Sequence, residues 1–416
     1  NGVVYFLAND GTSCFELWKS DGTEQGTVLV KDINPGGGSS IPQNLTEVNG
    51  TLFFAANDGA SGAEMWKSDG TADGTVLVKD INPGSAGSFA QDFMCVDGIV
   101  YFRASDGVND FEPWRSDGTA EGTFMLKDIS SIGSSQPGEF TDFNGTLLFR
   151  ANADLWKSDG TTEGTVLVKS VSPGLNPNFL TVVNGTLFFS ATDVTNGHEL
   201  WKSDGTEQGT MLVKDIRNGF DSSSPGVLAV LNGELFFRAT ISLGQHELWK
   251  SDGTDQGTVR VKAVAPGGLT VVNGTLFFSL DAGLLQLWKS DGTGQGTVSV
   301  KEIPDSGSGR SMSLANRNGA LFFFIHANDG SDDRDRWSSD GTAEGTIPSP
   351  DFGEPGGAPP PDDLTDVNGT LFFAADDGVN GVELWKSDGT GMGTVLVRDI
   401  LSGGAGSMPA ELTDVN

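Results

Sequence analysis

Residues 18–27 read Trp-Lys-Ser-Asp-Gly-Thr-Glu-Gln-Gly-Thr, and the whole chain repeats this phrase with small changes. Each copy begins with a tryptophan, and an Asn-Gly or Asp-Gly pair stands about 12 to 19 residues ahead of it. A repeat of 40 to 50 residues is typical of proteins built from one structural unit copied in tandem. The nine tryptophans are Trp18, Trp66, Trp114, Trp156, Trp201, Trp249, Trp288, Trp337 and Trp385.

Cutting the chain at these pairs assigns residues 1–415 to nine repeats, so we predict one domain over residues 1–416. The repeats span residues 1–48, 49–96, 97–143, 144–183, 184–231, 232–272, 273–317, 318–367 and 368–415. The chain begins without Met at a repeat boundary, and we therefore expect it to be part of a longer protein.

Each repeat is expected to supply four antiparallel strands. In the second copy, the turn Asn49-Gly50 separates two β-rich runs, residues 45–48 and 51–56. Asn-Gly between such runs is the strongest short hairpin signal, because a type I′ turn needs positive φ at both central residues. Residues 64–68 and 75–81 then give a third and a fourth strand, joined by a turn that contains Asp-Gly-Thr.

The second strand of each unit is apolar without alternation, as in Leu52-Phe53-Phe54, so both of its faces must be covered. Copies of one four-stranded sheet cover each other in a propeller. A solenoid would need polar end repeats, and the first and last repeats here are as apolar as the others. We predict an all-β fold, a single closed β-propeller of nine four-stranded blades, with eight blades as the alternative.

The positions of the repeat boundaries also predict how the propeller closes. The first repeat begins with its second strand, while residues 411–415 form a first strand without a blade of its own. The C-terminal strand is therefore expected to complete the first blade and to remove two open sheet edges.

Charge and composition exclude several classes of partner. Fifty-six acidic residues against 25 basic ones give a net charge of -31, which repels nucleic acid and anionic lipid headgroups. No apolar run approaches the roughly 20 residues of a membrane helix, so we expect no membrane insertion. Two cysteines make no disulfide framework, and free thiols are the preferred interpretation.

The phrase Glu16-Leu17-Trp18-Lys19-Ser20-Asp21-Gly22-Thr23, found again at residues 199–206, 247–254 and 383–390, resembles the bacterial ELWxxDGT-repeat proteins. The resemblance covers the whole chain and implies a secreted or surface-attached bacterial protein. The eighth repeat departs from the pattern, because Pro348 and Pro350 interrupt its fourth strand. Proline there fits an outer edge strand, since it cannot donate to a sheet ladder.

Residues that recur in every repeat are expected to build the framework. The aspartate before glycine in each turn can accept main-chain N–H groups. The tryptophans are expected to fill the space between blades, in preference to stacking on sugars. Lys or Arg follows tryptophan in eight repeats and also lies in the fourth strand of eight, so we expect the basic charge near the outer wall.

Function is therefore sought in the loops that vary, those joining the second to the third strand and one unit to the next. Acidic and histidine side chains there are candidates for a ligand-binding face, namely Asp106, Asp110, Asp193, His198, His246, Asp332 and Asp333. Clustered carboxylates could also hold Ca²⁺, and the candidate ligands are Asp10, Asp58, Asp329 and Asp377. A solvated acidic loop without metal is the simpler interpretation. No other cofactor is expected.

The motifs of catalysis are missing from the chain. It holds three histidines and no HExxH, glycine-rich phosphate loop or Ser-His-Asp order. We therefore expect a non-enzymatic extracellular or cell-surface module for adhesion, matrix or surface assembly, which binds a glycan or a surface protein. The alternative is a polysaccharide-active enzyme, a glycosidase or lyase, with carboxylates in a central channel; Glu47, Asp142, Asp366 and Asp414 share one position of the first strand.

Overall fold

The computed structural model describes residues 2–171, 174–304, 311–317, 319–326, 334–348, 365–388 and 393–415. Within these residues there is no helix, and the strands form nine four-stranded antiparallel sheets. The fold is therefore all-β, with nine propeller blades as predicted, and the alternative of eight blades is wrong. We number the blades 1 to 9 and give each as its four strands from the first to the last.

Blades 1, 2 and 3 are formed by β36 (Ala410–Val415), β1 (Val3–Asn9), β2 (Phe15–Ser20) and β3 (Val28–Lys31); β4 (Gln43–Val48), β5 (Thr51–Asn57), β6 (Ala63–Ser68) and β7 (Val76–Lys79); and β8 (Gln91–Val96), β9 (Ile99–Ser105), β10 (Phe111–Ser116) and β11 (Phe124–Met125). Blades 4, 5 and 6 are formed by β12 (Gly138–Phe143), β13 (Thr146–Ala151), β14 (Asp154–Ser158) and β15 (Val166–Lys169); β16 (Asn178–Val183), β17 (Thr186–Asp193), β18 (Gly197–Ser203) and β19 (Met211–Lys214); and β20 (Gly226–Leu231), β21 (Glu234–Ser242), β22 (Gln245–Ser251) and β23 (Val259–Lys262). Blades 7, 8 and 9 are formed by β24 (Leu269–Val272), β25 (Thr275–Asp281), β26 (Leu285–Ser290) and β27 (Val298–Glu302); β28 (Ser311–Arg317), β29 (Ala320–His326), β30 (Arg334–Ser339) and β31 (Ile347–Pro348); and β32 (Thr365–Val367), β33 (Thr370–Asp376), β34 (Val382–Ser387) and β35 (Val395–Arg398).

The chain divides into two compact units. Unit 1 comprises Asn1–Phe140, Gly160–Thr165 and Pro350–Asn416, and it holds blades 9, 1, 2 and 3. Unit 2 comprises Thr141–Asp159 and Val166–Ser349, and it holds most of blade 4 and blades 5 to 8. Both ends of the chain lie in unit 1.

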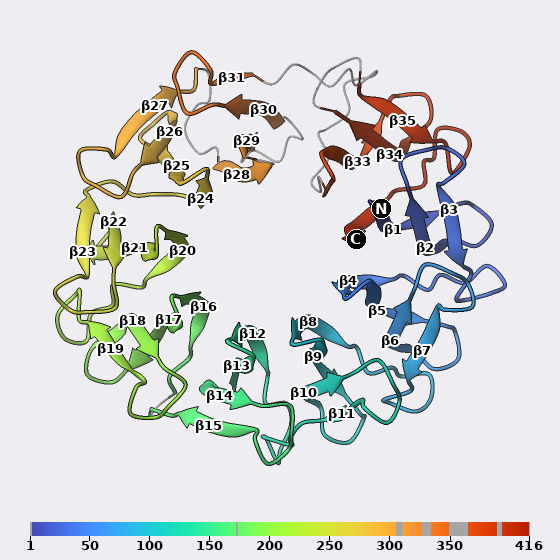
Figure 1. The fold of residues 1–416 in the computed structure, drawn as a ribbon, viewed down its shortest axis with the longest axis horizontal. Coiled ribbons are helices and arrows are strands. Elements are labelled where there is room, and N and C mark those ends of the chain that lie inside the picture. Colours follow the sequence, from blue (N-terminus) through green and yellow to red (C-terminus); the bar gives the residue numbers. More distant parts are fainter. Residues whose placement is uncertain are drawn as a thin grey trace. The chain divides into compact units, whose positions relative to one another are not determined.

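The C-terminal strand completes blade 1, as the sequence predicted. β36 pairs antiparallel with β1, and the register places Val3 opposite Val415 and Tyr5 opposite Thr413. Figure 1 shows β36 beside β1, with the two chain ends close together. The apolar side chains of Leu412 and Val415 pack against the cores on the two sides of this blade, so the strand contributes packing as well as main-chain hydrogen bonds.

The predicted hairpin is confirmed at Asn49-Gly50. β4 pairs with β5 through Val48 and Thr51, and φ is 51° at Asn49 and 80° at Gly50. Two positive φ angles are what a type I′ turn requires. Asn-Gly and Asp-Gly thus set the register between the first two strands of a blade.

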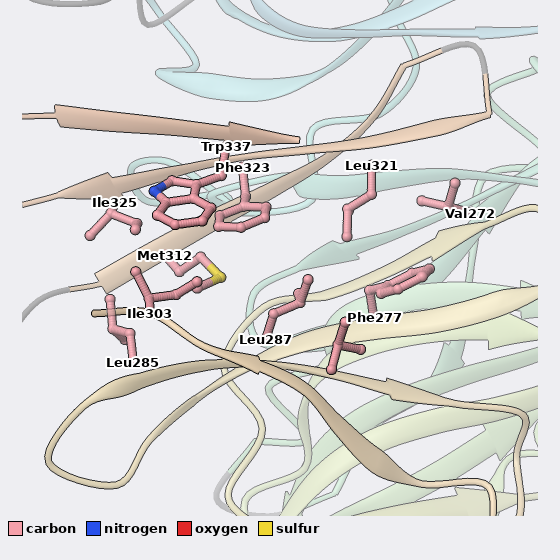
Figure 2. Packing of buried hydrophobic residues seen from close by; sticks show 11 residues of the cluster. Val272, Phe277, Leu285, Leu287, Ile303, Met312, Leu321, Phe323, Ile325 and Trp337 are labelled. Carbon is pink, nitrogen blue, oxygen red and sulfur yellow. The ribbon is translucent and has the colours of Figure 1, made fainter. Parts of the chain in front are cut away.

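The core lies between successive blades. In blade 2, Leu52, Phe53 and Phe54 of β5 are all buried, so both faces of the strand are covered. Figure 2 shows Trp337 and Phe323 of blade 8 beside Leu285 and Leu287 of blade 7. Trp66 likewise packs with Leu17 of blade 1. The tryptophans therefore fill the gaps between blades, as expected.

The Asp-Gly-Thr turn satisfies its own polar groups. Asp21 Oδ1 accepts hydrogen bonds from the backbone N–H and the hydroxyl of Thr23, at 2.9 and 2.7 Å. Gly26 donates its N–H to Thr23 Oγ1, and Ser20 and Thr27 join their hydroxyls at 2.7 Å beneath the turn. The repeated aspartate thus has the structural role that the sequence suggested. In blade 8, Pro348 lies in the edge strand β31, again as expected.

Candidate functional site

Each blade has two ends with different chemistry. One end carries the Asn-Gly hairpin and the Asp-Gly-Thr turn, and we call it the turn end. The other end carries the loop between the second and third strands and the connection to the next blade, and we call it the loop end. The repeat makes the turn ends nearly uniform, whereas the loop ends differ from blade to blade.

Basic side chains tie the turn ends of neighbouring blades together. After seven of the tryptophans, the Lys or Arg donates to the carbonyl of the Gly in the next blade's Asp-Gly pair; Lys19, for example, donates to Gly70 at 2.8 Å. The same bond is made by Lys67, Arg115, Lys157, Lys202, Lys289 and Lys386. These cations are bound to backbone oxygens of the neighbouring blade, so they join the blades; their expected place near the outer wall stays a prediction.

The basic residue of the fourth strand makes a second bond of this kind. Lys31 donates to the carbonyl of Thr75 at 2.7 Å, and Lys79 donates to that of Thr123 at 2.6 Å. Lys250 is an exception among the residues after tryptophan, since it pairs with Glu234 of its own blade at 2.9 Å. The basic side chains at these repeat positions thus serve the framework, since their donor groups are held by backbone oxygens.

A buried glutamate organises the loop end. Glu199 is fully buried, and its two carboxylate oxygens accept N–H bonds from Ile216 and Ser223, at 3.2 and 2.8 Å, and a hydroxyl bond from Ser223. These donors lie in the connection to the next blade. Burial raises the pKa of Glu199 to about 6, and the hydrogen bonds oppose this shift in part.

The same glutamate recurs in other blades and was not recognised from the sequence as buried. Burial raises the pKa of each of four equivalents, namely Glu16, Glu64, Glu112 and Glu383. The sequence signal was available, because one Glu stands two residues before most of the tryptophans. A repeated charged residue inside an apolar strand is expected to have buried partners.

The aspartates proposed as calcium ligands cap their own loops. Asp10 Oδ1 accepts the N–H groups of Thr12 and Ser13, at 2.8 and 2.7 Å. Asp58 and Asp377 do the same two and three residues further along the chain. For Asp58 and Asp377, desolvation raises the pKa, and the hydrogen bonds outweigh it, so the net pKa is lowered. The carboxylates of Asp58 and Asp377 are therefore ionised at neutral pH, and all three aspartates already hold their loops in shape.

The other acidic candidates follow the same pattern where the structure describes them. Asp106 and Asp193 each accept two backbone N–H groups at Oδ1 and a side-chain amide of Asn109 or Asn196 at Oδ2. Asp110 is exposed at the end of its loop, with φ of 43°. Asp329, Asp332 and Asp333 lie outside the described residues. In the described part of the chain, no three His, Cys, Asp or Glu side chains form a group suited to a metal ion.

The two equivalent histidines bond within their own blades. His198 Nδ1 lies 2.9 Å from Thr192 Oγ1, and His246 Nδ1 lies 2.9 Å from Thr240 Oγ1. Burial lowers the pKa of His198, so this ring is neutral at pH 7. Each histidine side chain thus forms a hydrogen bond with a threonine of the neighbouring strand in its own blade.

The carboxylates suggested for an enzyme lie at turn ends. Glu47, Asp142 and Asp366 accept the N–H of the glycine in the following Asn-Gly turn, from Gly50, Gly145 and Gly369. In blade 8, Asn316 makes the same bond to Gly319. An amide that replaces the carboxylate there shows that the position serves the turn.

Exposed apolar side chains gather at the loop ends, a feature that was not predicted from the sequence. Leu243, in the loop of blade 6, is 94% exposed, and Ile132, in the connection after blade 3, is 91% exposed. Val108, Val194, Phe220 and Val379 are further exposed examples in such loops. Aligning the repeats by their loops would have shown these residues, because they stand among Gly, Ser, Asn and Asp.

No family model and no curated protein matches this chain. Solved structures resemble it weakly. A computationally designed protein called Ika8 is 16% identical, with a TM-score of 0.44, over 75% of this chain and 86% of that one. A puromycin-hydrolyzing peptidase of Mycobacterium tuberculosis is 11% identical, with a TM-score of 0.41, over 76% of this chain and 54% of that one. Prolyl endopeptidases give 12% identity and a TM-score of 0.44, over 80% and 54%. This chain thus spans about half the length of the peptidases, and similarities this weak carry no functional argument.

Cys14 and Cys95 are both free, as expected. Among the described residues, no helix is long and apolar enough to cross a membrane.

Proposed function

We propose that the protein is a non-enzymatic extracellular or cell-surface module that binds a glycan or a surface protein through the loop ends of its blades. The strongest support for this proposal is that the side chains at the two ends of each blade have different roles. The repeated Lys, Asp and Trp side chains are used in the framework, whereas the loop ends combine exposed apolar side chains with ionised aspartates. Exposed apolar residues on rigid loops are typical of binding surfaces.

Binding is tested on panels of bacterial polysaccharides and surface proteins, with the full chain immobilised and affinity measured by surface plasmon resonance. Leu243→Asn and Phe220→Asn alter the loop ends, and Asp73→Asn alters an exposed turn end as the matched control. We expect a ligand whose affinity falls with the first two variants and is unchanged by the third. A ligand that responds only to the turn-end variant would contradict the proposal.

Catalysis is tested on the same panel by the release of new reducing ends. We expect none, because Glu47, Asp142 and Asp366 bond to the N–H groups of turns. Turnover that is lost in Asp366→Asn or Asp414→Asn would instead favour a polysaccharide-active enzyme.

A further inference from the structure

Three neighbouring blades share an unusual feature where one blade connects to the next. Met408, Ile41 and Phe89 occupy equivalent positions, each directly after a buried serine and ahead of the inner strands β36, β4 and β8. They are 54%, 49% and 51% exposed. All three blades belong to unit 1, and β4 contacts both β36 and β8. The three side chains therefore form a row, which we call the apolar row.

The framework does not require apolar side chains at this position. φ is 52°, 46° and 51° at Met408, Ile41 and Phe89, a left-handed conformation that costs energy for bulky or β-branched residues. In the next three connections the same position holds Gln136, Asn176 and Ser224, with φ of 50°, 47° and 46°. Polar residues thus adopt the same backbone conformation, and about half of each side chain of the apolar row stays exposed despite its strain.

A carboxylate accompanies each member of the apolar row. The carbonyl of Ser407, just before Met408, accepts the N–H of Asn9, and Asp10 follows. Ser40 and Asn57 make the same bond beside Ile41, where Asp58 follows. Ser88 and Ser105 repeat it beside Phe89, where Asp106 follows. Each of the three connections thus places one apolar side chain near one aspartate of the adjacent loop.

Among the described residues of unit 1, no Lys or Arg forms an ion pair with Asp10, Asp58 or Asp106. Of the nine Lys and Arg residues of this unit, eight donate to backbone carbonyl oxygens, namely Lys19, Lys31, Lys67, Lys79, Arg115, Lys127, Lys386 and Arg398. The ninth, Arg103, pairs with Asp92 at 2.9 Å. The apolar row therefore lies in a negative surface, on a chain whose net charge is -31.

We propose that the apolar row binds a cationic polypeptide segment in which apolar and basic side chains are interspersed. This rests on the proposed function and specifies the chemistry of the partner. Apolar side chains of the segment cover Met408, Ile41 and Phe89, while Lys or Arg pairs with Asp10, Asp58 and Asp106. Charge complementarity favours this partner over an acidic protein or an anionic polysaccharide, which the surface repels.

The test uses the full chain and a fluorescent peptide in which Lys alternates with Leu, with binding measured by anisotropy. Two reference peptides replace all Lys by Glu or all Leu by Ser. We expect binding of the first peptide alone, weakened by salt. Ile41→Asn combined with Phe89→Asn should weaken it by about tenfold or more, the usual effect of removing central apolar contacts.

Asparagine is chosen because it tolerates positive φ, so these variants should keep or raise the melting temperature. Phe179→Asn is the matched control, since Phe179 is also 51% exposed, has φ of 59° and lies in unit 2. It should leave peptide binding unchanged. The inference is overturned if the variant with Ile41→Asn and Phe89→Asn binds the Lys-Leu peptide with the same affinity as the unchanged chain. The inference is also overturned if the reference peptide with Ser in place of Leu binds as tightly as the Lys-Leu peptide, because charge alone would then be sufficient for binding. A ligand of the polysaccharide panel bound at other loop ends, with no peptide binding, overturns the inference and leaves the proposed function standing.

Discussion

Lys386 Nζ donates to the carbonyl oxygen of Gly22 at 2.7 Å, across 364 residues of sequence. The bond joins blade 9 to blade 1 by the same contact that Lys19 makes with Gly70 between blades 1 and 2. Arg398 donates likewise to Thr27, as Lys31 does to Thr75. The two ends of the repeat array thus meet through its ordinary blade-to-blade bonds, and β36 adds the pairing with β1.

Removal of residues 410–416 should lower the melting temperature far more than trimming an ordinary chain end. The deletion exposes the edge of β1 and removes the packing of Leu412 and Val415. Calorimetry compares the deletion with Leu412→Ser, which keeps the strand and loses part of its packing. An unchanged melting temperature in the deletion would contradict a stabilising role for this strand.

Substitution of a lysine that bridges blades should be more costly than substitution of one that does not. Lys202→Met removes the bond to the carbonyl of Gly253, for which we expect a loss of about 1–2 kcal/mol. Lys250→Met removes an ion pair within a blade, between partly exposed partners, which is worth about 0–1 kcal/mol. Urea unfolding measures both. Equal losses would show that the bridging bonds add nothing beyond ordinary surface pairs.

The second glycine of the Asp-Gly-Thr-x-x-Gly-Thr phrase should not tolerate a side chain. A Cβ at Gly26 would lie 2.0 Å from Asp21 Oδ1, so Gly26→Ala must displace the aspartate and break its bonds to Thr23. We expect a loss of about 1–3 kcal/mol. Gly268→Ala is the control, because no atom lies within 4 Å of its added Cβ and its φ is unstrained. Equal stability of the two variants would show that the turn rearranges freely.

The fold was largely predictable because the sequence repeats the residues that determine it. Asn49-Gly50 gave the hairpin and its register, and the unalternating run around Phe54 gave a strand covered on both faces. The surplus strand at residues 411–415 gave the pairing with β1. All three features follow from local turn geometry, from the apolar pattern of one strand or from the number of repeats. They can therefore be predicted without three-dimensional information.

The candidate site was less predictable because its important contacts join residues that are distant in sequence. The partners of Glu199 lie in the connection to the next blade, and no local pattern specifies them. The apolar row required knowing that β36, β4 and β8 are neighbours. The loop aspartates were recognised, but their use as caps for nearby N–H groups was not.

Calcium binding at the loop ends stays a prediction. A bound ion would share carboxylates that already accept N–H groups, as at Asp377, which favours the weak affinity of about 10⁻⁴ to 10⁻³ M typical of extracellular modules. We expect millimolar Ca²⁺ to raise the melting temperature more than NaCl of equal ionic strength, and Asp377→Asn to reduce the difference. The same shift with both salts would leave the aspartates as caps alone.

Stability should be greatest on the acid side of neutrality. The pKa of Glu199 is about 6 in the folded chain and ordinarily 4.5, so the folded state holds this proton more tightly. Its contribution to stability is therefore complete below pH 4.5 and is lost as the pH rises through 6. Turn aspartates such as Asp21 have a lowered pKa, because they accept bonds from Thr23, and their contribution is lost as the pH falls below about 3.8.

These opposite shifts predict a maximum of the melting temperature between about pH 4.5 and 5.5, measured by calorimetry at constant ionic strength. Protonation also relieves repulsion within a chain of net charge -31, and 0.5 M NaCl should screen that part while leaving the effect of the buried glutamates. Glu199→Gln is the matched variant. Its amide nitrogen replaces one of the two carboxylate oxygens and so faces the N–H of either Ile216 or Ser223 with another donor; the variant should lower stability at every pH and flatten the decline between pH 5 and 7. A decline that disappears in 0.5 M NaCl would assign the effect to surface charge and exclude the glutamates as its cause.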